Sequence, residues 1–269
     1  MRMYGAPMRG VQFESRKEAI GGNSCIDFLN DRRWPINSRR FGVKWKLAAM
    51  KNHSATARIP FWLKVGYTFF MIVLVPVYWA NYGLTNFLYF CDVALFITLY
   101  AVWKESRLAV SMAAVGILVP QLFWCLDFGM QFARELSTAE HSGMTAYMFD
   151  DSKSAFLRGL SLFHGWLPFL LMFLVSRLGY DPRALRHWTL LAWVLCLISF
   201  FLLPPAGAAL TDPNMPLNVN YVFGLDDTKK QTWLPDGAYL GIWMLALFTL
   251  AYLPTHLVLN KLANRRNAL

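Results

Sequence analysis

Charged residues are scarce in this chain: only 16% of its 269 residues are Asp, Glu, Lys or Arg, whereas 56% are hydrophobic. In soluble domains about a quarter of the residues are charged, so this composition excludes an ordinary soluble fold. Cysteines are also few, with no paired spacing, and all four except Cys25 fall in or at the ends of apolar runs. They indicate neither a zinc site nor a disulfide framework, and no metal is expected.

Motifs for soluble nucleotide or metalloprotease chemistry are missing as well. The chain has no glycine-rich phosphate loop and no HExxH helix, and no apolar stretch of the signal-peptide kind lies near Met1. These absences favour neither a nucleotide-driven mechanism nor signal cleavage. The net charge of +10 does not indicate a nucleic-acid partner, because the Lys and Arg residues gather between apolar runs and in the first 60 residues.

Residues 1–59 are polar and basic and have no sustained apolar period. We expect a cytoplasmic leader that is disordered or only locally helical. Met50 precedes a segment that would serve equally well as a cytoplasmic start, so we expect part of the leader to be a non-functional upstream extension. Residues 261–269 are expected to form a basic cytoplasmic tail.

Long apolar runs dominate the rest of the chain. Six of them lie in residues 60–260, each near the length of about twenty residues that a spanning helix needs. The sequence therefore predicts an all-α polytopic membrane protein, a bundle of six transmembrane helices. The expected spans are 61–80, 84–103, 107–127, 155–176, 185–204 and 237–258.

The basic residues predict the orientation of these spans. With the N-terminus in the cytoplasm, thirteen Lys and Arg residues lie inside, ignoring the distal leader, and five lie outside. This positive-inside bias places both termini in the cytoplasm, and we expect the bacterial inner membrane. The outer loops at 128–154 and 205–236 are long, which is typical of a lid or of a surface for a protein partner. Residues 131–149 are expected to form a short amphipathic helix there.

One carboxylate, Asp92, lies near the middle of the run 84–103. A charged Asp at that depth costs at least about 2.5 kcal/mol, and such residues normally face a protein interior and a partner. Counted along ideal helices, Asp92 and His164 are each roughly 13 Å below the outer boundary, and Gln121 is roughly 10 Å below it. We therefore expect Asp92 and His164 to be partners, with Gln121 in the same layer.

The same run carries further polar side chains near Asp92. As a continuous helix it would place Thr85, Tyr89 and Asp92 on one face. Asn86 would lie beside them, and Cys91 about 100° round the helix. The sequence thus predicts a polar face that continues from Asp92 toward the outside.

His164 has an unusual backbone setting. Pro168 lacks the amide that would bond the carbonyl of residue 164, and such irregularity is tolerated where it lines a cavity. A plain structural interpretation stays open, because an intramembrane His often only bonds neighbouring helices. His187 and His256, near cytoplasmic helix ends, are more typical of interfacial residues than of haem ligands, so no cofactor is expected.

The run YWANYGLTNFLYFCDVALF, with LSLFHGWLPFLL in the fourth helix, resembles a family of bacterial six-helix proteins known only as membrane-associated proteins. That resemblance covers most of residues 60–260 and implies no established activity. More distantly, a Thr or Cys on an early helix and a His on a later one is similar to the androgen-induced/TFPI-regulating group of intramembrane lipid hydrolases and to related ether-phospholipid acyltransferases. This second resemblance implies Thr85 or Cys91 as nucleophile and His164 as base; the chain departs from the pattern by placing Asp92 beside them.

Three functions remain open from the residues. A membrane enzyme would attack a lipid ester or acyl chain with Thr85 or Cys91, and His164 would take the proton. Asp92 would orient the imidazole, and the other polar side chains of the layer would bind the lipid substrate: Asn86, Tyr89 and Gln121. A proton-coupled carrier would use Asp92 and His164 instead, although no inverted repeat is evident. The third function is a non-catalytic scaffold.

Overall fold

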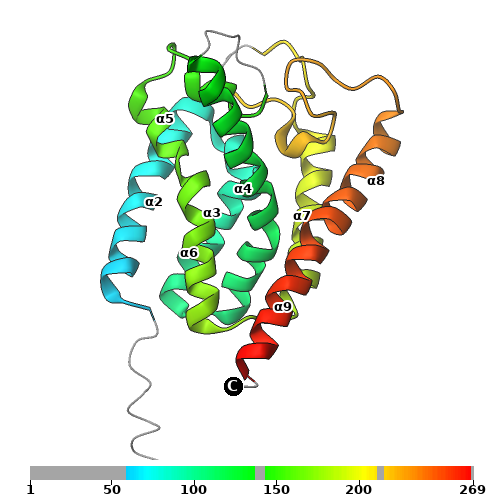
Figure 1. Ribbon diagram of the computed structural model, residues 1–269. Helices are drawn as coiled ribbons and strands as arrows, with labels where there is room; N and C mark the ends of the chain where they lie inside the picture. The colour runs from blue at the N-terminus through cyan, green and yellow to red at the C-terminus, as the bar shows by residue number, and fades with distance from the viewer. Residues whose placement is uncertain (1–58, 137–142, 211–214, 268–269) are drawn as a thin grey trace, which may run out of the picture. The chain divides into compact units, whose positions relative to one another are not determined.

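A computed structural model describes residues 59–136, 143–210 and 215–267, and within these ranges the chain is helical, with no strand. The predicted all-α class is confirmed; the leader at 1–58, including the alternative start at Met50, lies outside the described residues. Figure 1 shows the helices. They are α2 (Phe61–Tyr82), α3 (Phe90–Lys104), α4 (Arg107–Leu136), α5 (Ala155–Ser161), α6 (Phe163–Leu178), α7 (Ala184–Leu202), α8 (Asp236–Ala246) and α9 (Leu253–Asn267).

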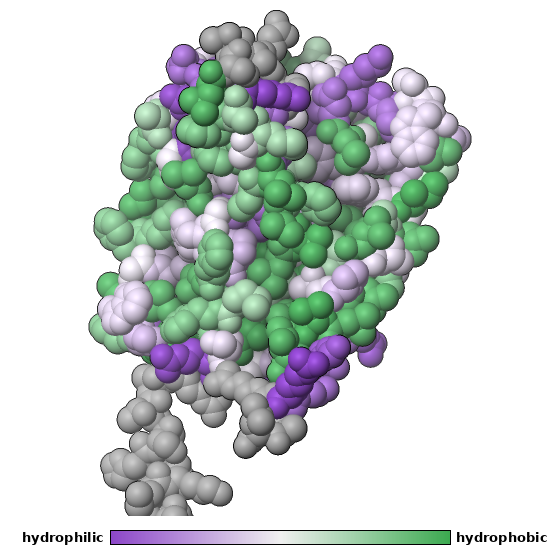
Figure 2. Space-filling view, viewed as in Figure 1, coloured by the Kyte–Doolittle hydropathy of each residue, from purple (hydrophilic) through white to green (hydrophobic). Residues whose placement is uncertain are grey.

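Apolar helices of spanning length make this a multi-pass membrane protein. Within the described residues, five segments are long and apolar enough: Phe61–Tyr82, Arg107–Leu136, Ala155–Leu178, Ala184–Leu202 and Asp236–Arg265. Large apolar side chains on them point outward, such as Phe169, which is 77% exposed, and Leu250, which is 71% exposed. Hydrophobic residues occupy the middle of the face seen in Figure 2, with hydrophilic residues at both ends. Such a surface suits lipid rather than water.

The predicted continuous helix over 84–103 is wrong. A short 3₁₀ helix, η2 (Leu84–Leu88), comes first; Tyr89 then takes an extended conformation with φ −61° and ψ 141°, and α3 begins at Phe90. At its 15 residues, α3 is about 22 Å long, less than the hydrocarbon core of about 30 Å. Thr85, Asn86 and Tyr89 therefore do not share one helical face with Asp92.

Other boundaries also differ from the sequence-based expectations. The predicted amphipathic helix at 131–149 is not continuous: its first residues belong to α4, and Ala146–Phe149 forms a separate 3₁₀ helix, η3. A break at Leu162 separates α5 from α6. The last span contains a π-helical segment, η5 (Leu247–Tyr252), and α9 continues through the expected tail to Asn267.

Helix α4 is central, because it contacts α3, α6, α7 and α9. Small residues allow this close packing, as is common between membrane helices: Ala113 and Ala114 are fully buried. At Gly116 the indole of Trp188 lies directly against the backbone, so that a Cβ would come within 1.9 Å of it. The packing of α7 on α4 therefore requires glycine at this position.

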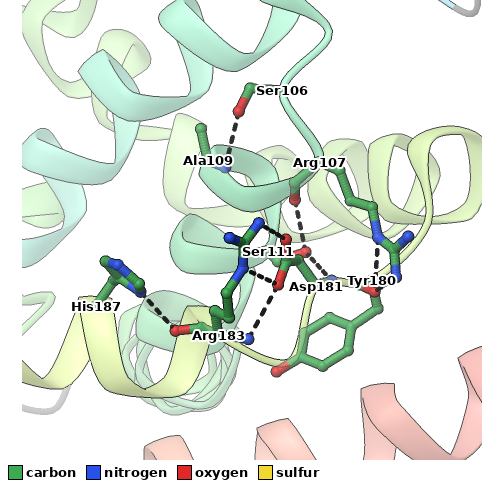
Figure 3. A network of polar contacts seen from close by, with 8 residues as sticks. All are labelled: Ser106, Arg107, Ala109, Ser111, Tyr180, Asp181, Arg183 and His187. Carbon is green, nitrogen blue, oxygen red and sulfur yellow. Dashed lines mark hydrogen bonds and ion pairs between the residues drawn. The ribbon is translucent and has the colours of Figure 1, made fainter. Parts of the chain in front are cut away.

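A polar network at the opposite end from η2 holds the turn between α6 and α7 (Figure 3). Arg107 Nε donates to the Tyr180 carbonyl at 2.8 Å, and the Asp181 amide donates to Ser111 Oγ at 2.9 Å. Arg183 forms a 2.8 Å ion pair with Asp181 and holds the pKa of that carboxyl below its ordinary value. These contacts fix the start of α4 against the start of α7.

Candidate functional site

The break at Tyr89 gives Asp92 a different setting from the one expected. Asp92 lies in the first turn of α3 and is 3% exposed. Its Oδ2 accepts a hydrogen bond from Asn86 Nδ2 at 3.2 Å and lies 4.0 Å from Cys91 Sγ, which donates to it. Because a helix N-terminus favours negative charge, the break itself offsets part of the cost of burying this carboxylate.

Asp92 still has an unsatisfied atom. Its Oδ1 is buried and has no hydrogen-bond partner in the described part of the chain. Leaving a buried acceptor unpaired costs about 1–3 kcal/mol, and more for a charged group. Because most buried polar atoms in proteins are hydrogen-bonded, this carboxylate oxygen requires an explanation, and a role in accepting a proton or a ligand is one.

His164 does not pair with Asp92. No hydrogen bond or ion pair between them occurs among the described residues, so the predicted direct partnership is not formed. Instead His164 Nδ1 lies 2.7 Å from the carbonyl oxygen of Ser161. A carbonyl can only accept, so Nδ1 carries the proton, and in the neutral ring Nε2 keeps its lone pair.

Aromatic rings hold the imidazole on both sides. Its centroid lies 4.8 Å from that of Trp124, with the planes 13° apart, and 4.0 Å from that of Phe163. The carbonyl of His164, which Pro168 leaves without a helical donor, accepts a hydrogen bond from Cys125 Sγ at 3.9 Å. The expected backbone irregularity therefore exists, and a thiol of α4 satisfies it.

Tyr78 belongs with His164, because its hydroxyl lies 2.8 Å from Ser161 Oγ, and the Ser161 carbonyl lies 2.7 Å from His164 Nδ1. Asn86, Cys91 and Asp92 lie at the same end of the bundle, at the break between η2 and α3. We call this set of side chains the outer polar cluster: Tyr78, Asn86, Cys91, Asp92, Ser161 and His164.

Tyr147 lies on η3, in the outer segment between α4 and α5, and is half-buried. Burial raises the pKa of its hydroxyl. The segment is anchored by Asp127, whose Oδ2 accepts hydrogen bonds from the Thr145 amide at 2.8 Å and from its hydroxyl at 2.7 Å.

The side chains of the remaining predicted site residues, Thr85, Tyr89 and Gln121, form no hydrogen bond with the outer polar cluster among the described residues. Gln121 is 2% exposed, and its Oε1, like Thr85 Oγ1, is buried without a hydrogen-bond partner in the described ranges. Tyr89 turns to the outer loop, where its hydroxyl donates to the Leu217 carbonyl at 3.2 Å. None of these three forms a hydrogen bond with His164 in the part of the chain that the structure describes.

Metal ligation finds no support where it can be examined: the described residues contain no group of three or more His, Cys, Asp and Glu side chains with suitable placement. The two other histidines of the apolar segments have protein partners. His256 Nδ1 lies 2.6 Å from the Tyr180 hydroxyl, and His187 Nδ1 donates to the Arg183 carbonyl at 2.8 Å.

Sequence reasoning missed Tyr78 and Ser161 as members of the site, because hydroxyl-bearing residues in apolar runs are usually interfacial or packing residues. One local signal was present: Ser161 precedes His164 by three residues, the spacing at which a side chain meets the backbone of the preceding helical turn.

Comparison with family models, with curated proteins and with solved structures finds no match, so the resemblances seen in the sequence stay predictions.

Proposed function

We propose that this chain is an intramembrane enzyme of acyl transfer, a lipid hydrolase or acyltransferase, in which Cys91 is the nucleophile and His164 the base. The observation that carries the proposal is the tautomer of His164, whose Nδ1 is held by the Ser161 carbonyl so that Nε2 accepts a proton. Membrane lipid is the proposed substrate, because the outer polar cluster lies in a bundle whose outward side chains are apolar.

The carbonyl of Ser161 takes over the orienting role that Asp92 was expected to have. A group that accepts from Nδ1 fixes both the tautomer and the direction of Nε2, as the carboxylate does in a catalytic triad. Stacking on Trp124 and Phe163 restricts rotation of the ring. Pre-orientation of this kind is what a general base requires.

Cys91 is the better nucleophile of the two candidates. Its Sγ donates to Asp92 Oδ2 at 4.0 Å, so the thiol belongs to the outer polar cluster that also contains the base. Thr85 lies on η2, beyond the break. The thiol and imidazole are not hydrogen-bonded here, and catalytic hydrogen bonds often shorten only when substrate binds.

The proposed reaction has two steps. Cys91 Sγ forms a bond to the ester carbonyl carbon, its proton moves to His164 Nε2, and the alcohol leaves with that proton, which yields an acyl thioester. Water or the hydroxyl of a second lipid then attacks the thioester, gives its proton to Nε2 and releases the thiol. Water produces a fatty acid and a lipid hydroxyl produces a new ester.

We further propose six spans with both termini in the cytoplasm of a bacterial cell. Lys64 near the start of α2 forms a 2.9 Å ion pair with Glu105, just before α4 begins. At the other end, Tyr78 of α2 and Trp124 of α4 both meet residues at the start of the α5–α6 segment. Helices α2 and α4 are therefore parallel, which requires η2 and α3 together to return across the membrane.

An acyl-transfer assay tests the enzyme. The purified protein in vesicles of phosphatidylethanolamine with a fluorescent acyl chain is expected to release or transfer that chain. Cys91→Ala and His164→Ala are expected to lower the rate by about 10²–10⁴-fold, as is typical when a general base is lost. His256→Ala, a histidine near the opposite end of the bundle, is the matched control. Full activity in His164→Ala, or no turnover by the wild type, would refute the proposal.

A proton-coupled carrier is a second candidate, favoured by Asp92 Oδ1 and Gln121 Oε1, which are buried and have no hydrogen-bond partner among the described residues. The two candidate functions predict different effects of single substitutions. In proteoliposomes, a carrier would lose proton uptake with Asp92→Asn and retain it with Cys91→Ala, whereas the enzyme would lose acyl transfer with Cys91→Ala. A non-catalytic scaffold would respond to neither substitution.

A further inference from the structure

The outer loop at 215–224 reaches into the break between η2 and α3 and places one side chain there, Asn220. Resting on the proposed function, we infer that Asn220 is a positioning residue that holds Cys91 and Asp92 in their working geometry.

The amide of Asn220 satisfies both sides of the break. Its Oδ1 accepts a hydrogen bond from the Phe90 amide at 3.0 Å, and its Nδ2 donates to the Leu88 carbonyl at 2.9 Å. Because Tyr89 is extended, these two backbone groups lack the partners that a continuous helix would supply. A side chain 130 residues along the chain from Phe90 replaces them.

Two further contacts tie Asn220 to neighbouring helices. Its Nδ2 also donates to Ser199 Oγ of α7 at 3.2 Å, and its carbonyl accepts from Trp243 Nε1 of α8 at 2.8 Å. Asn220 is 2% exposed. The start of α3 is therefore joined to α7 and α8 through one residue.

The backbone of the loop is shaped for this purpose. Asn218, Asn220 and Tyr221 have φ values of 49°, 62° and 59°. Non-glycine residues in this region are strained, and such strain persists only where surrounding contacts over-determine it. Asn218 provides internal contacts, because its Nδ2 donates to the Gly224 carbonyl at 2.9 Å and its Oδ1 accepts from the Phe223 amide at 2.8 Å. Asn218 stabilises the loop itself, whereas Asn220 stabilises the break between η2 and α3.

Cys91 and Asp92 follow directly after Phe90, so their side-chain directions depend on the first turn of α3. If the Phe90 amide loses its acceptor and Leu88 its donor, this turn is free to fray or to join η2. Either change would rotate the carboxyl away from Asn86 and would separate the thiol from that carboxyl. Asn220 therefore acts on the proposed nucleophile through the backbone, without touching it.

Asn220→Gly and Asn218→Gly form a matched pair, because glycine accepts a positive φ in both positions and only the side-chain contacts are lost. The measurement is the rate of alkylation of each cysteine by iodoacetamide in the vesicle-embedded protein, read by peptide mass spectrometry. We expect Asn220→Gly to raise the Cys91 rate by about tenfold or more relative to Cys125 and Cys196, because two to three buried hydrogen bonds are lost. Asn218→Gly is expected to change that ratio by less than about threefold.

General loss of stability would raise all three alkylation rates together and would overturn the inference, as would equal effects of the two variants. The acyl-transfer assay adds a second readout, in which Asn220→Gly is expected to lower kcat at least about tenfold with KM within about twofold. A wild type without acyl transfer would refute the proposed function alone, because the Cys91 alkylation ratio would still report whether Asn220 positions the start of α3.

Discussion

Gly116 shows how one residue sets the distance between two helices. The indole of Trp188, which is fully buried, occupies the space where any other residue would place its Cβ. Membrane helices gain no hydrophobic driving force from meeting each other, so close van der Waals contact of this kind carries much of their association.

Gly116→Ala is therefore expected to destabilise the bundle by about 1–3 kcal/mol, since inserting a methyl group into a packed site forces its neighbours to move. Gly129→Ala in the same helix is the control, because nothing lies within 4 Å of its Cβ position. That variant is expected to be neutral, or stabilising by up to about 1 kcal/mol from helix propensity. Unfolding in detergent followed by circular dichroism measures both; equal effects would contradict the packing described for Trp188.

At the scale of elements, the outer loop carries two adjacent carboxylates with opposite pKa shifts. The hydroxyl and amide of Thr228 donate to Asp226 at 2.7 and 2.8 Å and lower its pKa. Burial, followed by the charge of Asp226, raises the pKa of Asp227 to about 6. These opposite shifts predict two opposing pH-dependent contributions to the stability of the loop that carries Asn220.

The sign of each contribution follows from these shifts. Asp227 binds its proton more tightly in the folded state, so its stabilising contribution is complete below about pH 4 and is lost as the pH rises through 6. Asp227→Asn should thus stabilise the protein at pH 8 and not at pH 4, by less than about 1 kcal/mol because the side chain is partly exposed. Asp226→Asn should do the reverse, with its cost present at pH 8 and vanishing as the pH falls below 4. Thermal unfolding of the variants from about pH 3 to about pH 8 measures this, and effects of the same sign in the two variants would contradict it.

At the scale of the whole molecule, the proposed topology places the outer polar cluster on the side away from the cytoplasm. Cysteine labelling in intact cells tests it. Ser152→Cys is expected to react with an impermeant maleimide and Arg186→Cys is not, and both positions are exposed in the structure. Thr145, in the loop of Ser152, and Asp181, in the turn just before α7, are buried and would be poor reporters. Reaction at residue 186 and not at residue 152 would show that the protein has the opposite orientation in the membrane.

Much of the fold was predictable from the sequence because it depends on local properties. Apolar runs of spanning length predict helices wherever they occur, and α2 and α7 begin within a residue of the expected positions 61 and 185. The freed carbonyl of His164 was predictable for the same reason, since it follows from the covalent structure of Pro168.

The contacts inside the bundle were decided only by the tertiary structure. Depths counted along ideal helices placed Asp92 and His164 together, but the breaks at Tyr89 and Leu162 change both the depth and the direction of every side chain near them. The break at Tyr89 is stabilised by Asn220, which no local pattern connects to it. The sequence by itself determined that polar groups would be buried in an apolar bundle. Which of them meet depends on helix rotation and on long-range hydrogen bonds, and these exist only once the chain has folded.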